Sequence, residues 1–464
     1  MQAKGQQIKI QETASTALPV IMDSVVYDIP KISRLCDNLK IQGNKIDIGD
    51  CELYYETEGS GTPLVIINGG PGGTHHYFHP WFSAIKNDFK IIYYDQRGCG
   101  LSDFKPGNGY SFEQAVDDLE KLRKALQIRK WVVVGYSYGG AVAQFYTVKY
   151  PENLIATILI SAHPLITDTI ALKTQQNLFI STKEKDKISA IYRLYGQKKI
   201  NIQQLIYNNL LNGDWKRQHY YKPTTEDAAR TALYEWVNDK GFNAAVGSDM
   251  SMYDFKKAFE GNPVPTLLCE GKHDLTWGNK KADLIKGNHP TAQFAFFENS
   301  AHDIYADEPA LFFLTLKNFL EKANSPPKKS LLTWKKYTSG LLDSQFITIA
   351  NTRTLISLVK VKGAAEAKKK YVELKAIQQS GRIFIEAEIN DLGQSLIRNG
   401  KIAEAVEVFT MVTEEFSNSS TAFESLADAY SKNGDKMQAV KNYKQSLALN
   451  PDNTNVKEKL KILE

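Results

Sequence analysis

A five-residue turn, Gly135-Tyr-Ser-Tyr-Gly139, constrains the fold more than any other part of this 464-residue chain. The apolar run 131–134 (Trp-Val-Val-Val) precedes it, and a helix-like run begins at Ala141. Strand, tight turn and helix in this order form the context of a nucleophile elbow, in which glycines let the chain turn sharply and expose a strained central residue. The central residue here is Ser137, so we expect a serine nucleophile that needs a base, an orienting acid and an oxyanion hole.

Strand-like and helix-like segments alternate on both sides of this turn. Residues 44–48 and 51–58 alternate apolar and polar positions, which predicts a β-hairpin. Helical spacing predicts helices at 111–126 and 309–322. Apolar runs predict further buried strands at 63–67 and 89–94, and three more strands at 155–160, 265–269 and 292–297. The alternation indicates an α/β fold with a mostly parallel sheet that is covered by helices on both faces.

The alternation stops at residues 163–262, which divides the chain into regions. This stretch is helical in pattern and rich in aromatic residues, and an insert of this size beside an active-site face predicts a helical cap. Residues 325–345, which begin with Ser-Pro-Pro, are expected to form a linker. The other expected regions are a polar leader at 1–25, the α/β core at 26–162 and 263–324, and an all-α domain at 346–464.

The expected all-α domain contains an internal repeat. Three pairs of matching residues are 34 positions apart: Leu392 and Leu426, Ala405 and Ala439, and Phe409 and Tyr443. This period and these positions resemble the tetratricopeptide repeat, a helix–turn–helix unit, and residues 355–377 are expected to form an earlier, degenerate copy. Such units bury their apolar faces only by stacking, so we expect a small solenoid that binds a protein partner or associates with itself.

Two residues follow later apolar runs in the order that a nucleophile elbow predicts, with the acid first and the base second. Asp274 is the expected acid, and His302 is the expected base. His302 would accept the proton of Ser137, while Asp274 would orient the imidazole and stabilise its charged form. His273 is an alternative base and Glu270 an alternative acid.

The oxyanion hole needs two backbone donors. We expect the N–H of Tyr138, directly after the nucleophile, to supply one of them. The loop 68–73 follows a predicted buried strand, and Gly70 in this loop is expected to supply the other. Because a residue without a side chain lets the loop approach a substrate closely, Gly69 is also expected to line the substrate site.

Composition argues against several classes of protein. A net charge of +5, without a basic stripe interleaved with aromatics, does not favour nucleic-acid binding. No apolar run approaches the roughly 20 residues of a membrane span. The polar N-terminus lacks a signal-peptide core, so a cytoplasmic location is the default expectation, and a periplasmic or secreted one is expected if a signal peptide was removed.

No metal or cofactor site is expected. The four cysteines include no Cys-x-x-Cys pair, and free thiols are expected although Cys36 and Cys51 could pair in an oxidising compartment. His75, His76 and His79 could place two imidazoles on one helix face, but no carboxylate or cysteine lies nearby in the sequence to complete a ligand set. These histidines are therefore expected to form a packed pocket wall.

Three glycine-containing stretches follow one another along the chain: 68–73 (Asn-Gly-Gly-Pro-Gly-Gly), 95–102 (Asp-Gln-Arg-Gly-Cys-Gly-Leu-Ser) and 135–140 (Gly-Tyr-Ser-Tyr-Gly-Gly). In this order and spacing they resemble the prolyl aminopeptidase (proline iminopeptidase) family of α/β-hydrolases. The resemblance covers roughly residues 40–322. It implies an α/β-hydrolase fold with a helical cap, and release of an N-terminal residue, often proline, from short peptides.

The resemblance also assigns roles to residues. It implies Ser137, Asp274 and His302 as the catalytic triad, and Gly70 and Tyr138 as the oxyanion donors. The family anchors the free amine of its substrate with acidic residues of the cap, and a buried ammonium group needs such a partner.

Two features bear on substrate choice. Glu235 is the expected cap acid and Glu226 a weaker alternative, while Asn68 stands where the family usually has histidine. We therefore expect a serine aminopeptidase acting on short peptides. The alternatives are an esterase or other acyl hydrolase of the same fold, and a repeat-mediated scaffold with a vestigial hydrolase. Epoxide hydrolase and dehalogenase chemistry is disfavoured, because it uses a carboxylate where Ser137 stands.

Overall fold

The computed structural model describes residues 25–34, 39, 41–104, 110–165, 182–212, 221, 224–236, 250, 252–274, 281–323, 327–378 and 381–464. The chain divides into two compact units. Unit 1 comprises Met1–Pro164, Asp168–Gly247 and Phe259–Leu331, and unit 2 comprises Leu165–Thr167, Ser248–Ala258 and Leu332–Glu464. Residues 1–24 of the expected leader and Cys36 lie outside the described residues, whereas Cys51, Cys99 and Cys269 are buried free thiols.

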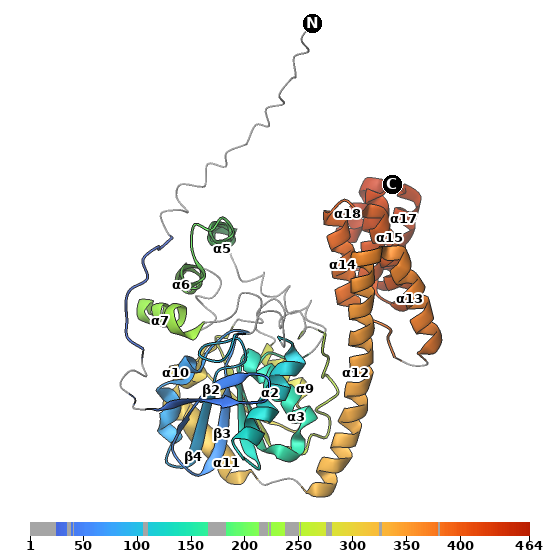
Figure 1. Ribbon diagram of the computed structural model, residues 1–464. Helices are drawn as coiled ribbons and strands as arrows, with labels where there is room; N and C mark the ends of the chain where they lie inside the picture. The colour runs from blue at the N-terminus through green and yellow to red at the C-terminus, as the bar shows by residue number, and fades with distance from the viewer. Residues whose placement is uncertain are drawn as a thin grey trace. The chain divides into compact units, whose positions relative to one another are not determined.

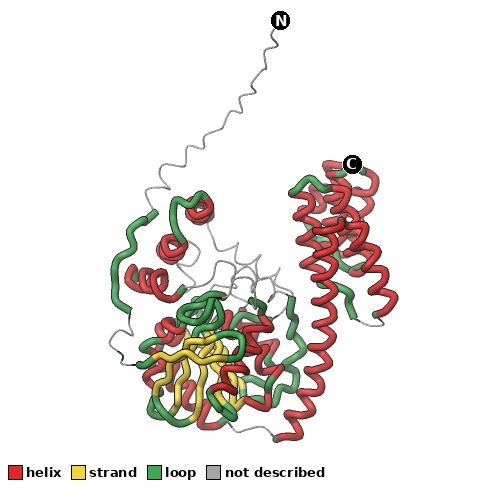
Figure 2. The backbone as a smooth tube through the Cα atoms, viewed as in Figure 1, coloured by secondary structure: helices red, strands yellow, loops and turns green. Residues whose placement is uncertain are grey.

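The described part of unit 1 is built on one sheet of eight strands (Figure 1, Figure 2). In chain order the strands are β1 (Gly43–Asp47), β2 (Glu52–Glu58), β3 (Thr62–Ile67), β4 (Phe89–Tyr94), β5 (Trp131–Tyr136), β6 (Leu154–Ile160), β7 (Thr266–Gly271) and β8 (Gln293–Phe297). Across the sheet they run β1-β2-β4-β3-β5-β6-β7-β8. The β1–β2 and β2–β4 pairs are antiparallel, and the remaining pairs are parallel. The predicted hairpin, strands and mostly parallel sheet are confirmed.

The central strands are apolar because both faces of the sheet are covered. Every residue of β5 is buried, and so is nearly all of β6. On one face, alternate residues such as Leu64 and Ile66 pack against the short helices η2 (His75–Phe78) and η3 (Trp81–Ile85) and against α11 (Pro309–Lys322). This arrangement explains why the buried strands read as continuous apolar runs rather than as alternating ones.

The other face of the sheet carries α2 (Phe112–Ala125) and α3 (Tyr138–Lys149), which pack against each other (Figure 1). The rings of Phe112 and Phe145 lie 5.5 Å apart between these two helices. The Ser111 hydroxyl caps α2 by accepting a hydrogen bond from the N–H of Gln114. Three shorter helices complete the described core: η4 (Pro151–Asn153), α9 (Lys281–Asn288) and α10 (Ile304–Asp307).

Most of the described part of the insert between β6 and β7 is helical. It contains α5 (Thr182–Gly196), α6 (Ile202–Asn212), α7 (Thr225–Arg230) and the one-turn π-helix η6 (Thr231–Glu235). Residues 26–34, expected in the α/β core, instead pack against these helices, as does Val25 of the expected leader. Asn208 accepts a hydrogen bond from the N–H of Val26 and donates one to its carbonyl. This segment forms no strand, so only its contacts with residues distant in the sequence show which part of the fold it belongs to. The sequence pattern does not reveal such contacts.

The described part of unit 2 is helical. Its helices are α12 (Lys328–Lys362), α13 (Ala364–Ile377), α14 (Glu386–Arg398), α15 (Ile402–Glu415), α16 (Ser420–Lys432), α17 (Lys436–Leu449) and α18 (Thr454–Leu463), of which the first begins in the last residues of unit 1. The matched repeat positions face the interior: Ala405, Ala439, Phe409 and Tyr443 are all buried. Within the described residues, none of the helices is long and apolar enough to cross a membrane.

Most of the stretch expected as a linker, 325–345, is helical, because α12 begins at Lys328. Proline is compatible with a helix N-terminus, and Pro327 stands directly before the first residue of α12. Trp334, Thr338 and Leu342 recur at helical spacing and are buried. The Trp334 indole donates a hydrogen bond to the carbonyl of Ala258, which belongs to the same unit although it falls in the range expected for the cap.

Candidate active site

Ser137 occupies the sharp turn between β5 and α3. Its backbone has φ 54° and ψ −117°, a strained conformation for a residue with a side chain, and the residue is partly exposed. Gly139 allows the turn, since a Cβ there would lie 2.2 Å from the carbonyl oxygen of Ile67 in β3. The predicted strand–turn–helix context of the serine is therefore present.

His302 and Asp274 come together at the carboxyl ends of two parallel strands. Asp274 lies three residues beyond β7, and His302 lies five residues beyond β8. The Nδ1 atom of His302 is 2.8 Å from Oδ2 of Asp274, and both side chains are buried. The His302 ring lies 5.1 Å from the ring of Tyr136, the neighbour of Ser137 in the chain. With Nδ1 held by a carboxylate, Nε2 is the atom left for proton transfer.

The alternative acid and base lie in different surroundings. Glu270 is buried inside β7. The ring of His273 packs against Tyr221 with the centroids 4.5 Å apart, and the backbone N–H of His273 donates to the carbonyl of Ser300. The contact between His302 and Asp274 is thus the pairing that the sequence order of acid and base predicts.

The glycine loop after β3 lies against the elbow. A Cβ on Gly69 would be 3.2 Å from Cβ of Ser137 and 2.8 Å from the Tyr136 ring, so only glycine fits there without a shift. Gly70 follows with φ +130°. The N–H of Tyr138 belongs to the first turn of α3, where backbone donors have no partner inside the helix and the helix dipole favours negative charge.

Asn68 holds this loop in place of the histidine that is usual in the family. It is fully buried, its amide donates to the carbonyl of Gly73, and its Oδ1 accepts from Nε2 of Gln96 at 3.3 Å. Both ends of the loop are therefore tied to one side chain, and that side chain is tied to the loop after β4.

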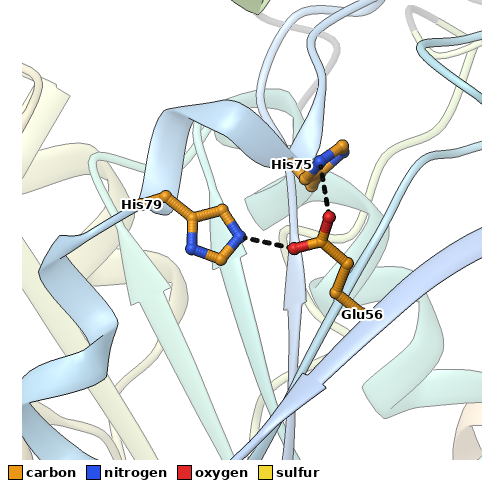
Figure 3. Close-up of side chains that lie close together, drawn as sticks. All are labelled: Glu56, His75 and His79. Atoms are coloured by element: carbon orange, nitrogen blue, oxygen red, sulfur yellow. Dashed lines mark ion pairs between the residues drawn. The ribbon is translucent and has the colours of Figure 1, made fainter. Parts of the chain in front are cut away.

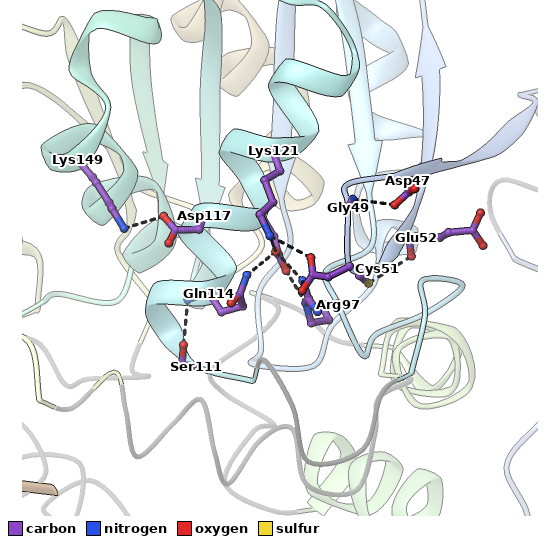
Figure 4. A network of polar contacts seen from close by, with 12 residues as sticks. Asp47, Gly49, Cys51, Glu52, Arg97, Ser111, Gln114, Asp117, Lys121 and Lys149 are labelled. Carbon is purple, nitrogen blue, oxygen red and sulfur yellow. Dashed lines mark hydrogen bonds and ion pairs between the residues drawn. The ribbon is translucent and has the colours of Figure 1, made fainter. Parts of the chain in front are cut away.

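The loop after β4 is in turn fixed to its surroundings by charged side chains. Arg97 makes a two-pronged contact with Asp118 of α2, at 2.7 and 2.8 Å, and a further ion pair at 3.0 Å with Asp50 beside the β1–β2 hairpin. Figure 4 shows Arg97 between α2, which carries Gln114 and Lys121, and the hairpin. The motif 95–102 thus braces the loop that is expected to bind the oxyanion.

A cavity of about 470 Å³ lies between the described part of the insert, the helices η2 and η3, and the segment that follows β8. Its lining residues include four carboxylic acids and one arginine: Asp227, Glu235, Asp303, Asp307 and Arg230. Asp303 directly follows His302, and the Tyr136 hydroxyl donates a hydrogen bond to it. The surplus of acidic groups favours a positively charged ligand in this cavity.

Glu235 is the most unusual of these acids. It is 4% exposed, and its Oε2 atom has no hydrogen-bond partner within the described part of the chain. Burial, with a smaller contribution from the negative charge of Asp303, raises the pKa of Glu235 to about 8. Burial also raises the pKa of Asp307 to about 7. Glu226, the alternative cap acid, is exposed.

Asp303 and Asp307 were not predicted as site residues. They lie one and five positions after His302, but nothing local distinguishes them from helix-capping acids. His75 and His79 have a carboxylate beside them in the structure, because Glu56 of β2 reaches both of them from a distant part of the sequence.

Comparisons with known proteins agree with the fold and the motifs. Residues 62–309 match the family described as alpha/beta hydrolase fold, and residues 420–453 match the tetratricopeptide repeat. A proline iminopeptidase of Saccharolobus solfataricus is 30% identical over 278 residues, which cover 58% of this chain and 88% of that protein. A cis-3-alkyl-4-alkyloxetan-2-one decarboxylase of Shewanella oneidensis is 26% identical over 292 residues, which cover 59% of this chain and 86% of that protein.

Among solved structures, an alpha/beta fold family hydrolase from Bacillus anthracis has a TM-score of 0.50 at 20% identity. The match covers 61% of this chain and 99% of that protein, which shows that the two share a fold. The sheet order, the elbow, the extent of the family match and the curated relative all point the same way. The chain therefore belongs to the α/β-hydrolase fold family, as a proline iminopeptidase-like hydrolase that also carries tetratricopeptide repeats.

Proposed function

We propose that the protein is a serine aminopeptidase that releases an N-terminal residue, with proline as the first substrate to test. The observation that carries this proposal is Glu235, a buried carboxyl group in an acidic cavity that is also lined by Asp303, the chain neighbour of His302. A carboxyl group without a full set of hydrogen bonds favours a charged hydrogen-bond donor as its partner. The free amine of a peptide N-terminus is such a donor.

The catalytic steps follow from the placement of the side chains. Ser137 Oγ would attack the carbonyl carbon of the N-terminal residue while Nε2 of His302 takes the serine proton. The carbonyl oxygen becomes negative in the tetrahedral state, where the N–H groups of Tyr138 and Gly70 would stabilise it. His302 would then return the proton to the leaving amine, and water would hydrolyse the acyl-enzyme by the same steps.

Asp274 would act through His302 rather than on the substrate. Its contact with Nδ1 selects the imidazole tautomer that leaves Nε2 free to accept a proton, and it stabilises the charged ring. Gly69 would line the substrate site, since its position against Ser137 keeps the approach to the nucleophile open.

The helices between β6 and β7 would serve as a cap that carries the amine anchor. Glu235 lies at the end of η6, and its carbonyl accepts a hydrogen bond from the N–H of Thr74 in the loop after β3. The tetratricopeptide match indicates protein interaction, and we propose that unit 2 docks a protein partner or a second copy of the chain.

The test compares proline p-nitroanilide with its N-acetylated form. We expect turnover of the free-amine substrate alone, loss of turnover in Ser137→Ala, and a 10- to 100-fold lower kcat/KM in Glu235→Gln, about the loss of one hydrogen bond to a charged group. Glu226→Gln is the matched control and should keep wild-type activity. Equal turnover of both anilides, or cleavage of simple esters only, would refute the aminopeptidase and favour the esterase.

A further inference from the structure

Three buried side chains form a cluster that the proposed hydrolase does not use. Glu56 extends from β2, His75 opens η2, and His79 follows the end of η2 (Figure 3). Both histidines are 1% exposed and Glu56 is 9% exposed. Their ligand atoms all lie within 4.8 Å of one another.

The distances within this cluster suit one metal ion. The Nε2 atom of His75 is 3.4 Å from one carboxylate oxygen of Glu56, and Nε2 of His79 is 3.0 Å from the other. A tetrahedral ion with nitrogen and oxygen ligands at about 2.0–2.1 Å separates neighbouring ligand atoms by about 3.3 Å. Two imidazoles and one carboxylate also form a ligand set that binds transition metals in preference to calcium or magnesium.

The second coordination sphere of such a site is also present. The other ring nitrogen of His75, Nδ1, lies 2.9 Å from Oδ1 of Asp95, and the same oxygen accepts the backbone N–H of His75 at 2.8 Å. The second oxygen of Asp95 accepts the N–H of Leu101. A carboxylate on the far nitrogen of a ligating histidine fixes the ring and its tautomer.

His79 is bonded less completely than His75. Its Nε2 atom pairs with a carboxylate oxygen of Glu56 at 3.0 Å, and its Nδ1 atom has no hydrogen-bond partner within the described residues. The ring is held by stacking on Tyr93, with the centroids 4.0 Å apart. His79 also lines the 470 Å³ cavity, which gives an ion a path to the cluster.

We propose that Glu56, His75 and His79 bind one divalent transition-metal ion of the zinc class. The ion would join β2 to η2. Thr74, which precedes His75, donates hydrogen bonds to the carbonyls of Tyr234 and Glu235 at 2.9 and 3.0 Å. The site is therefore structural in character, since it fixes the segment on which η6 of the insert rests.

Metal binding is measured directly on the full-length protein after treatment with EDTA and dialysis. Co²⁺ is the spectroscopic probe, and we expect about one equivalent to bind with visible d–d absorption that Zn²⁺ then displaces. Glu56→Gln and His79→Ala should lose this absorption. His76→Ala removes a neighbouring imidazole of the same helix, and this variant should retain the Co²⁺ absorption. Asp95→Asn should weaken affinity by about 10- to 100-fold.

A second readout covers variants that fold poorly. Zn²⁺ should raise the melting temperature of the wild-type protein by several degrees, and EDTA should reverse the rise. Wild-type protein that binds neither ion, or His79→Ala protein that binds Co²⁺ as well as wild type does, would overturn the proposal and leave the cluster as an ion-pair network only. Because no measurement involves turnover, the result is independent of the proposed aminopeptidase activity.

Discussion

Replacing Glu235 by glutamine should make the protein more stable while it impairs the proposed reaction. Burial raises the pKa of Glu235 to about 8 from an ordinary value of 4.5. Between these two values the folded state holds a proton that the unfolded state has released, so stability falls as pH rises through this window. Glutamine occupies nearly the same volume and has no proton to lose.

The size of the effect follows from the pKa shift. Each pKa unit corresponds to about 1.4 kcal/mol, and pH 7 lies about 2.5 units above the ordinary pKa of a glutamate side chain. The ionisable side chain therefore lowers the free energy of unfolding by about 3 kcal/mol at pH 7 and by about 1 kcal/mol or less at pH 5. Glu235→Gln should be more stable than wild type by amounts that grow in this way with pH, up to about pH 8.

The assay is urea denaturation of wild type and Glu235→Gln at a series of pH values from about 5 to 8, followed by tryptophan fluorescence. Glu226→Gln, at an exposed position of the same insert, should shift stability by less than about 0.5 kcal/mol at every pH. A stability difference for Glu235→Gln that does not change with pH, or a variant that is less stable than wild type at pH 7, would refute the reasoning that Glu235 is buried and protonated.

The other predictions concern the catalytic pair and the framework that holds it. Asp274→Asn should lower kcat by about 10⁴-fold in the anilide assay while the fold is retained, and a loss below tenfold would contradict its role. Gly69→Ala should lower the free energy of unfolding by about 1–3 kcal/mol and reduce kcat, because its methyl group would press on the elbow, whereas Gly196→Ala has open space and should be neutral on both measures. Arg97→Ala should lower the free energy of unfolding by about 3 kcal/mol, since it removes the two-pronged partner of the buried Asp118 and leaves this carboxylate with Gln114 and Lys121. Lys45→Ala, which removes the exposed ion pair between Lys45 and Asp103, should lower the free energy of unfolding by less than about 1 kcal/mol in the same denaturation experiment.

The sequence predicts those parts of the fold that depend on local patterns. The strands, the capped helix after Ser111 and the helix 309–322 each follow from a run of neighbouring residues, and all are present. The elbow is equally local, because strand, turn and helix are consecutive. The pairing of His302 with Asp274 could also be expected, since both follow strands that lie side by side in the sheet.

What the sequence does not reveal depends on contacts between distant segments. Glu56 meets His75 and His79 only because β2 lies beside β4 in the sheet, so no spacing rule links these residues. Asp303 joins Glu235 in one cavity although the two are far apart in the chain. The sequence likewise did not predict that α12 begins within the expected linker, because the buried positions of this helix contact a segment about 80 residues earlier in the chain.

One measurement tests the central claim, that Ser137 is a nucleophile activated by His302 and served by an amine-binding carboxylate. A diaryl phosphonate analogue of proline with a free amine is incubated with the protein, and the adduct is located by peptide mass mapping. The account predicts one adduct on Ser137, slow labelling by the N-acetylated analogue, and no labelling of His302→Gln. An adduct on another residue, or equal labelling of His302→Gln, would contradict it.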